Sequence, residues 1–225
     1  MQFLYDNQSG NGTIDLKGEN FNYLIKVRRH KENDDIALRS LEDPNELYIY
    51  TLNSIQPKRA SLLLKEHKHL PIKSEKRVHI GWCVVDSASI EKALPMLNEI
   101  GVDRVTFIYC ARSQRNIKLN LERFTRVLNT SSMQCGRSTP MKISIDKSLD
   151  NFLQENKDTV IIDFSVEKVD KDVRNETFLI GCEGGFSEDE RKNFSDLSLK
   201  KLGLDSPMIL RSESAVVAIS SKILL

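Results

Sequence analysis

Three glycines and one acid near the C-terminus, in Gly181-Cys-Glu-Gly-Gly185, are the residues best suited to hold a small molecule. Glycine has no side chain, so its backbone can turn sharply and come close to a ligand. The apolar run Phe178–Ile180 precedes this loop and predicts a buried strand. Ser187 and Glu190 follow it with the spacing of a capping box, which predicts the start of a helix. Strand, glycine loop and helix in this order are typical of a cofactor site in an α/β domain.

The glycine loop lacks the features of a phosphate-binding loop. It is not G-x-G-x-x-G, and G-x-x-x-x-G-K-[ST] occurs nowhere in the chain. Glu188, Asp189 and Glu190 fill the first turn of the expected helix, and their charges would repel a phosphate. The loop therefore disfavours ATP and dinucleotides, and favours a cofactor with a ribose and a cationic centre, such as S-adenosylmethionine. A glycine turn without any ligand is the alternative.

The chain from residue 72 onwards alternates between strand-like and helix-like segments. Strands are expected at residues 78–85, 105–109, 142–145, 159–163 and 178–180. Helices are expected at residues 89–100, 119–133 and 148–154, from residue 187 onwards, and at 211–225. This alternation predicts an α/β fold with a mostly parallel sheet covered by helices. Ligands bind such sheets at the carboxyl ends of the strands, where the glycine loop lies.

The N-terminal residues predict a separate small β-barrel. Short strand-like runs at residues 36–38, 47–52 and 60–64 are separated by dense turn residues, and residues 20–26 suggest a short helix. Pro71 interrupts a mostly polar link at residues 69–76. We therefore expect two domains, residues 1–71 and 72–225.

Composition restricts the class of protein further. The chain has 33 Lys and Arg against 32 Asp and Glu, so net charge alone indicates no acidic partner. Its four cysteines are far apart and form no C-x-x-C, which predicts reduced thiols and no metal site. The first 30 residues contain no basic-then-apolar signal sequence, and no apolar run is long enough to span a membrane. We expect a cytoplasmic protein without membrane contact.

Basic residues gather locally despite the neutral total. Residues 26–31 contain four cations and a histidine, and residues 104–126 contain six Lys or Arg but only one acid, Glu122. Such patches suggest contact with a nucleic-acid backbone, although a solvated charged face is the alternative. The candidate RNA-binding residues are Lys26, Arg28, Arg29, Lys31, Arg112, Arg115 and Arg137.

The motifs together resemble the RsmE family of SPOUT-class RNA methyltransferases. Residues 181–187 are similar to the family's G-P-E-G-G-F-S loop. Leu202-Gly203 and Ile209–Ala215 are similar to its L-G-x-x-I-L-R-x-E-T-A segment. Weaker similarity covers residues 23–29, 33–34, 99–102, 111–113 and 133–140, so the resemblance extends over nearly the whole chain.

The chain departs from the family pattern at several positions. Cys182 replaces a proline in the glycine loop, and Ser214 replaces a threonine but keeps the hydroxyl. Phe107 and Ala111 stand where the family usually has proline and glutamate, in what we expect to be the loop on the RNA side. Met133 replaces a glutamate and Tyr23 a histidine.

The resemblance implies a fold that hydrophobic periodicity does not predict. It implies a SPOUT-type parallel sheet with a C-terminal trefoil knot, a PUA-like N-terminal barrel and a homodimer. It also implies S-adenosylmethionine-dependent methylation of N3 of a specific uridine in 16S ribosomal RNA of the small subunit, without a metal. The implied cofactor-binding residues are Ile180, Gly181, Glu183, Gly184, Gly185, Leu202, Gly203, Ile209, Leu210 and Ser214.

The expected reaction needs a cation and a proton acceptor. N3 of uracil is protonated at neutral pH and becomes a good nucleophile only when that proton leaves. Arg211 and Arg112 are the candidates to stabilise the negative charge at O2 or O4. Glu213 or Glu183 could accept the proton, although Glu183 could instead organise the loop by hydrogen bonds.

Three alternatives remain at this point. The first is an RNA-binding protein that keeps the fold without methyl transfer, and the second is a SPOUT enzyme with another RNA target. The third, a nicotinamide-dependent enzyme, is disfavoured by the missing fingerprint. The histidines offer no better chemistry: His30 lies in the basic patch, where we expect it to meet phosphate, and His67 and His69 share a strand face without a third metal ligand nearby in sequence.

Overall fold

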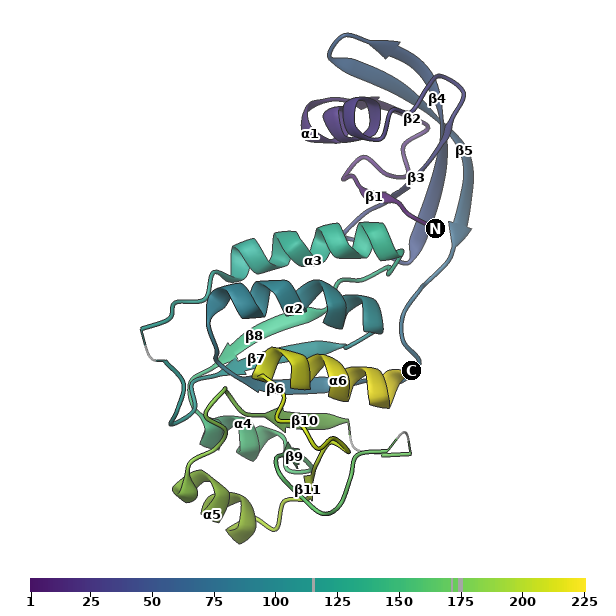
Figure 1. Ribbon diagram of the computed structural model, residues 1–225. Coiled ribbons are helices and arrows are strands. Elements are labelled where there is room, and N and C mark those ends of the chain that lie inside the picture. Colours follow the sequence, from purple (N-terminus) through teal and green to yellow (C-terminus); the bar gives the residue numbers. More distant parts are fainter. Residues whose placement is uncertain (115, 171, 174–175) are drawn as a thin grey trace. The chain divides into compact units, whose positions relative to one another are not determined.

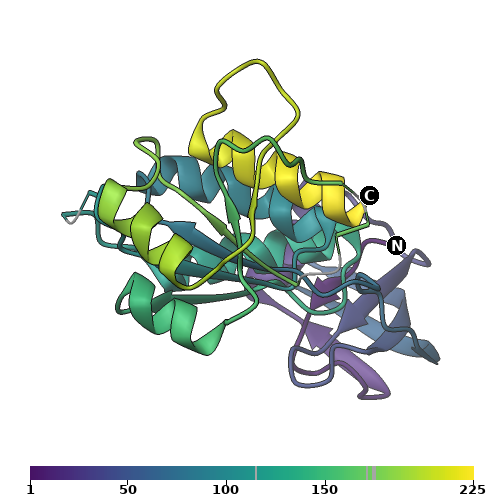
Figure 2. The ribbon, with the colours of Figure 1, turned by 90° about the horizontal axis from the view of Figure 1, so that it is seen from below.

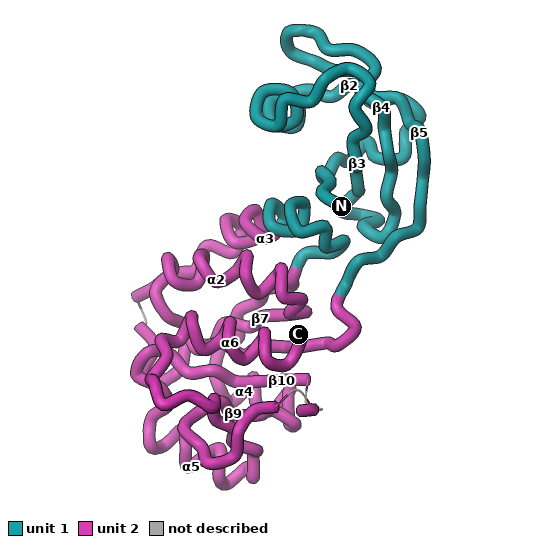
Figure 3. Tube along the Cα trace, turned by 45° about the vertical axis from the view of Figure 1, so that its right-hand side comes forward, with its two compact units in different colours: residues 1–73, 129–140 teal, residues 74–128, 141–225 magenta. Residues whose placement is uncertain are grey.

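The computed structural model describes residues 1–114, 116–170, 172–173 and 176–225. These residues form two compact units, shown in Figure 3. Unit 1 comprises Met1–Lys73 and Asn129–Pro140, and unit 2 comprises Ser74–Leu128 and Met141–Leu225. The segment Asn129–Pro140 joins the N-terminal unit although it lies far from it in sequence, which the sequence did not predict.

Unit 2 contains a six-stranded sheet in the order β11-β9-β10-β6-β7-β8 (Figure 1). All pairings described in it are parallel, which confirms the predicted α/β class. The strands are β6 (His79–Cys83), β7 (Arg104–Ile108), β8 (Lys142–Asp146), β9 (Val160–Ile162), β10 (Thr177–Ile180) and β11 (Lys201–Leu202). The sequence missed β11, because a strand of two residues has no readable hydrophobic period.

Helices cover both faces of this sheet. They are α2 (Ser87–Ile100), α3 (Leu121–Cys135), α4 (Leu149–Glu155), α5 (Glu188–Asp196) and α6 (Ser212–Leu224), all close to the predicted spans. Figures 1 and 2 show α2 and α6 packed side by side on one face, with α4 and α5 on the other. None of the described helices is long and apolar enough to cross a membrane.

Local sequence explains where α2 begins and ends. The Asp86 carboxylate accepts hydrogen bonds from the backbone N–H groups of Ala88 and Ser89, as an N-cap does. Gly101 ends the helix with φ of 109°, a left-handed conformation that glycine adopts readily. Pro95 lies within the helix.

Phe107 belongs to the core of unit 2, as the strand predicted at residues 105–109 implied, whereas its placement in the RNA-side loop, which came from the resemblance, is wrong. It sits within β7 and is fully buried. Its ring centroid is 6.1 Å from that of Trp82 and 5.9 Å from that of Phe124. Its departure from the family pattern therefore concerns packing in the core. Of the two departures expected on the RNA side, only Ala111 remains a candidate for contact with RNA.

Cys83 and Cys110 form a disulfide, so the expectation of reduced thiols is wrong for this pair. Cys83 ends β6, and Cys110 follows the neighbouring strand β7, so both lie at the same edge of the parallel sheet. Their 27-residue separation gave no sign of this proximity. Cys135 and Cys182 are free thiols.

Unit 1 contains a mixed five-stranded sheet in the order β1-β3-β4-β5-β2. Its strands are β1 (Leu4–Tyr5), β2 (Thr13–Leu16), β3 (Asp35–Arg39), β4 (Glu46–Gln56) and β5 (Arg59–His69). The β1–β3 pair is parallel, and the other pairs are antiparallel. Two register shifts between β4 and β5 are irregularities of the kind that bend a sheet. A short helix α1 (Gly18–Phe21) continues into a π-helix, Asn22–Val27, where the sequence predicted a helix.

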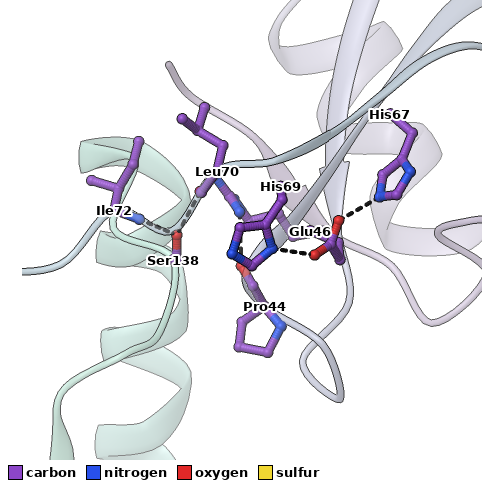
Figure 4. Close-up of polar contacts among 8 residues, drawn as sticks. Pro44, Glu46, His67, His69, Leu70, Ile72 and Ser138 are labelled. Carbon is purple, nitrogen blue, oxygen red and sulfur yellow. Dashed lines mark hydrogen bonds and ion pairs between the residues drawn. The ribbon is translucent and has the colours of Figure 1, made fainter.

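Glu46 on β4 lies between two histidines of β5 (Figure 4). Its carboxylate oxygens contact Nε2 of His67 and Nδ1 of His69. These hydrogen bonds, with His69 contributing most, lower the pKa of Glu46. The sequence placed both histidines on one strand face but gave no sign of Glu46, which comes from the paired strand. Among the described residues, no group of three His, Cys, Asp or Glu side chains could hold a metal ion.

The segment Asn129–Pro140 joins unit 1 partly through Ser138 (Figure 4). The Ser138 hydroxyl accepts a 2.7 Å hydrogen bond from the Ile72 N–H and donates one to the Leu70 carbonyl. Arg39, buried in the same region, also donates to the Leu70 carbonyl, at 2.8 Å. Residues directly after β5 are thus held by partners from two distant segments.

A stability test concerns His79, at the start of β6. It packs on Phe152 and bonds Thr106, and burial lowers its pKa to about 4, with Arg104 acting in the same direction. The unfolded chain takes up a proton at about pH 6.5, while the folded chain does so only at about pH 4. The free energy of unfolding should therefore fall as pH falls through this window.

We predict that His79→Gln loses less stability on acidification than the parent chain does. Urea unfolding of both proteins at about pH 7 and about pH 4.5 measures the difference. An equal loss in the two proteins would show that His79 does not titrate in this way.

Candidate cofactor-binding site

A cavity of about 340 Å³ lies at the carboxyl ends of β9 and β10, in unit 2. Three segments wall it: the glycine loop, the residues after β9, and the segment after β11. The predicted cofactor-binding residues that line it are Ile180, Gly181, Glu183, Gly184, Gly185, Gly203, Ile209 and Leu210. Leu202 and Ser214 are not among the lining residues. The volume lies within the range of small-molecule sites, ~300–1,000 Å³.

The glycine loop folds tightly on itself. The Gly185 N–H donates to the Cys182 carbonyl at 2.9 Å, and Gly185 has φ of 64°. A Cβ on Gly181 would lie 3.2 Å from the Gly185 Cα, so the two backbones approach closely. Cys182, at the proline position of the family, is buried, and burial raises the pKa of its thiol. That thiol lies 3.7 Å from the Gly185 carbonyl oxygen and donates to it across the turn.

The helix after the loop begins with the predicted capping box. The Ser187 hydroxyl accepts from the Glu190 N–H at 3.1 Å, and the Glu190 carboxylate accepts from the Ser187 N–H at 2.8 Å. Acidic side chains fill the rest of the first turn. None of residues 187–190 lines the cavity, so this acidic turn lies beside it in sequence after the glycine loop, where it makes the helix start a poor site for a phosphate.

An ion pair in the cavity wall was missed by the sequence analysis. Arg191 on α5 binds Asp163 through Nε at 2.8 Å and Nη2 at 3.3 Å. The Asp163 side chain is 8% exposed, and the Arg191 guanidinium lies over Gly185. The available signal was a polar residue directly after a buried strand, at the edge where parallel sheets bind ligands.

Gly203 shows why the segment after β11 needs a glycine. A Cβ there would lie 2.9 Å from the backbone oxygen of Ser165 and 3.3 Å from that of Asp163. The Gly203 N–H also donates to the Glu167 carbonyl at 2.8 Å. The close approach fixes this segment against the residues after β9 and closes one wall of the cavity.

Ser212 joins the start of α6 to the glycine loop. Its hydroxyl donates to the Gly181 carbonyl at 2.5 Å and accepts from the Trp82 indole N–H at 2.8 Å. Ser212 and Trp82 are both buried. The sequence analysis assigned Ser212 no role, because its importance comes from contacts 31 and 130 residues away.

The three predicted catalytic residues occupy different positions around the cavity. Arg112 donates through Nη1 to the Gly184 carbonyl at 2.5 Å, which places it against the glycine loop. Arg211, the N-cap of α6, is 82% exposed, and its Nη1 lies 4.0 Å from Glu213 Oε1. The other Glu213 oxygen is buried and has no hydrogen-bond partner among the described residues. Neither Arg211 nor Glu213 lines the cavity itself.

The predicted RNA-binding residues are partly available for contact. In unit 1, Lys26, Arg28, Arg29 and Lys31 are all exposed. Arg28 stacks over the Tyr23 ring and donates to its hydroxyl, while His30 is bonded to Asp34. The last contact gives His30 a carboxylate neighbour, in place of the phosphate that we expected for it.

Other members of the basic runs have protein partners. Arg137 is half-buried and donates to the Thr139 carbonyl at 2.8 Å. Arg123 forms an ion pair with Glu91 at 2.7 Å. Arg115 lies outside the described residues. Arg137 belongs to unit 1, whereas Arg123 belongs to unit 2, where its ion pair with Glu91 removes one cation from the predicted basic patch.

Comparison with known proteins places this site in a class. Residues 73–224 match the model of an RNA methyltransferase domain. A structure of ribosomal RNA small subunit methyltransferase E from Neisseria gonorrhoeae, bound to S-adenosylmethionine, has a TM-score of 0.80 at 19% identity and covers 98% of this chain and 95% of its own. A Legionella pneumophila protein in complex with the same cofactor has a TM-score of 0.79 at 20% identity, with 97% and 94% covered. At these identities the two structures show the shared fold.

Curated sequences narrow the class to one family. Ribosomal RNA small subunit methyltransferase E of Helicobacter pylori is 35% identical over 225 residues, covering 98% of both chains. The protein of that name from Aquifex aeolicus is 25% identical, covering 97% of this chain and 96% of its own. The chain belongs to the ribosomal RNA small subunit methyltransferase E family.

A substitution at Gly203 tests the construction of the cavity. Gly203→Ala would force the new methyl group against backbone atoms of Ser165, which cannot move aside as a side chain can. We expect a loss of about 1–3 kcal/mol in the free energy of unfolding, together with weaker S-adenosylmethionine binding. Gly12→Ala is the matched control, because a Cβ there would meet nothing within 4 Å. Urea unfolding and calorimetry measure both effects, and equal behaviour of the two variants would contradict the close approach.

Proposed function

We propose that this chain transfers a methyl group from S-adenosylmethionine to N3 of a uridine in 16S ribosomal RNA. Its family membership supports the reaction class, and its relatives are named for the small ribosomal subunit. The observation that carries the proposal is the cavity itself. It brings together the glycine loop and the segment after β11, the two motifs on which the resemblance to methyltransferases depends.

The residues of the cavity suit this cofactor. S-adenosylmethionine supplies a methyl group on a sulfonium, which is already activated for transfer. Apolar side chains such as Ile162 and Leu204 can pack against an adenine, and the glycine backbone allows close contact. Glu183 lines the cavity and favours a cationic centre, and the acidic first turn of α5 after the glycine loop disfavours a phosphate. The chain's own task is then to orient N3 and to handle its proton.

Arg211 and Arg112 are the residues proposed to stabilise the charge that develops on uracil. Arg112 is held at the cavity's rim by Gly184, and exposed Arg211 is free to reach a bound base. Glu213 is proposed to accept the proton, because a buried carboxylate oxygen without a partner among the described residues is suited to receive one. Glu183, exposed in the cavity wall, is the second candidate.

We further propose a C-terminal trefoil knot and a homodimer. The segment after β11 returns to the glycine loop, where Ser212 bonds Gly181, as a threaded chain end requires. Large apolar side chains are exposed around the cavity, and they suit burial by a second copy. They are Phe164, Val166, Met208 and Ile209. Unit 1 is proposed to be a PUA-like barrel that grips RNA, in a cytoplasmic enzyme.

The rival without methyl transfer loses most of its support. It rested on a changed loop at Phe107 and Ala111, and Phe107 lies in the core. The remaining change, Ala111, keeps its backbone N–H bonded to Glu190.

One experiment tests the proposed reaction and Arg211 together. In a strain lacking this gene, 16S rRNA should lose a 3-methyluridine, as measured by nucleoside mass spectrometry. The parent gene and the control Lys92→Ala should restore it, whereas Arg211→Ala should not, since loss of such a charge-stabilising group costs roughly 10²-fold or more in rate. Persistence of 3-methyluridine in the deletion strain would refute the function, and restoration by Arg211→Ala would refute that residue's role.

The basic patch of unit 1 can be tested by salt titration. Replacing Lys26 and Lys31 by Ala should weaken binding to 16S rRNA and flatten the dependence of log K on log salt. The expected change in slope is about 0.7–0.9 for each phosphate that the variant no longer neutralises. The pair Lys92→Ala and Lys192→Ala is the control, because it changes net charge equally on exposed residues of unit 2. An unchanged slope in the Lys26 and Lys31 variant would exclude this patch from the RNA interface.

A further inference from the structure

We propose that Glu190 is a positioning residue that makes cofactor and RNA bind cooperatively. It does so by holding residues 110–113, the turn after β7 that carries Arg112, against the glycine loop. The inference rests on the proposed function, since it assigns the cavity to the cofactor and Arg112 to the RNA side.

The two oxygens of Glu190 serve two different segments. Oε2 accepts from the Ser187 N–H at 2.8 Å and completes the cap of α5. Oε1 accepts from the Ala111 N–H, also at 2.8 Å, across 79 residues of sequence. The capping box needs only the first of these bonds. The second therefore ties the loop after β7 to the helix that follows the glycine loop.

Arg112, which follows Ala111, makes a second contact, this time with the glycine loop itself. Arg112 donates through Nη1 to the Gly184 carbonyl at 2.5 Å. Its Cδ also covers Gly184, since a Cβ there would lie 3.2 Å away. Residues 111 and 112 thus hold both ends of the connection between the glycine loop and α5. A shift of the glycine loop that accompanies ligand binding must be transmitted to Arg112.

The end of the same loop that directly follows β7 is fixed, so the shift is not absorbed there. Cys110 is joined to Cys83 by the disulfide. Ser113 turns back on it, with its N–H bonded to the Cys110 carbonyl at 3.1 Å. Residues 111 and 112 lie between these two positions and carry the contacts to α5 and to the glycine loop. Because energetic coupling between two sites is reciprocal, RNA held by Arg112 must equally strengthen cofactor binding.

Glu190→Gln separates the two duties of the carboxylate. Glutamine also occurs in capping boxes, but its side chain has a single acceptor oxygen. Its oxygen replaces one carboxylate oxygen and its NH2 group replaces the other, so when the cap bond to the Ser187 N–H is kept, the NH2 group faces the Ala111 N–H, donor against donor. Ser187→Ala is the matched control, because it removes the other half of the cap and leaves the Ala111 bond in place.

The test is calorimetry with S-adenosylhomocysteine, an unreactive probe, alone and with unmethylated 16S rRNA. The ratio of the two dissociation constants is the coupling, and we expect about fivefold or more for the parent protein. Glu190→Gln should bring the ratio close to one, while Ser187→Ala should keep the parent's ratio. A parent ratio of one, an unchanged ratio in Glu190→Gln, or an equal loss in Ser187→Ala would overturn the inference.

A second variant protects the test if Glu190→Gln fails to fold. Ala111→Pro removes the N–H donor without touching the cap, and it should also bring the ratio close to one; retention of the parent's ratio would overturn the inference. Failure of the proposed function looks different, because the parent protein would then bind no S-adenosylhomocysteine at all.

Discussion

The hydroxyl of Ser212 makes the two hydrogen bonds on which the site depends. It accepts from the indole of Trp82, in the middle of the sheet, and donates to the carbonyl of Gly181, at the start of the glycine loop. A buried hydroxyl with both bonds satisfied fixes the positions of its partners, because breaking either leaves an unpaired polar group. One side chain thereby anchors the glycine loop to both the rigid sheet and α6, the helix that carries Arg211 and Glu213 at its start.

Electrostatics then determine which ligand the cavity suits. Acidic residues and a complete capping box fill the start of α5, and the cation of Arg191 is neutralised by Asp163. The charged side chains in the cavity's lining are Asp163, Lys168, Glu183 and Arg191, so the cavity offers glycine backbone, apolar walls and a balanced charge. The acidic start of α5 next to the glycine loop disfavours a phosphate there, which agrees with a glycine-rich loop that binds a phosphate-free cofactor.

The parts that the sequence predicted well are those governed by local patterns. Alternating apolar segments predicted the parallel α/β sheet, and Ser187 with Glu190 predicted the start of α5 correctly. Eight of the ten cofactor-binding residues proposed from the glycine motifs line the cavity. In each case the signal lay within a few residues of the feature.

The parts that it missed depend on contacts between distant residues. The disulfide joins Cys83 and Cys110 only because β6 and β7 are neighbours. Asp163 and Arg191 meet across the cavity, and Glu46 reaches two histidines from the paired strand. Phe107 was assigned to the RNA-side loop from the family motif, although the apolar pattern had correctly predicted a strand there. The hydrophobic pattern of the sequence cannot predict these contacts, because they depend on the order of the strands in the sheet.

The central claim is that this cavity holds S-adenosylmethionine. Calorimetric titration of the purified protein with S-adenosylmethionine and, separately, with NADH tests it most directly. The account predicts saturable binding of S-adenosylmethionine and none of NADH. Binding of NADH without binding of S-adenosylmethionine would contradict it.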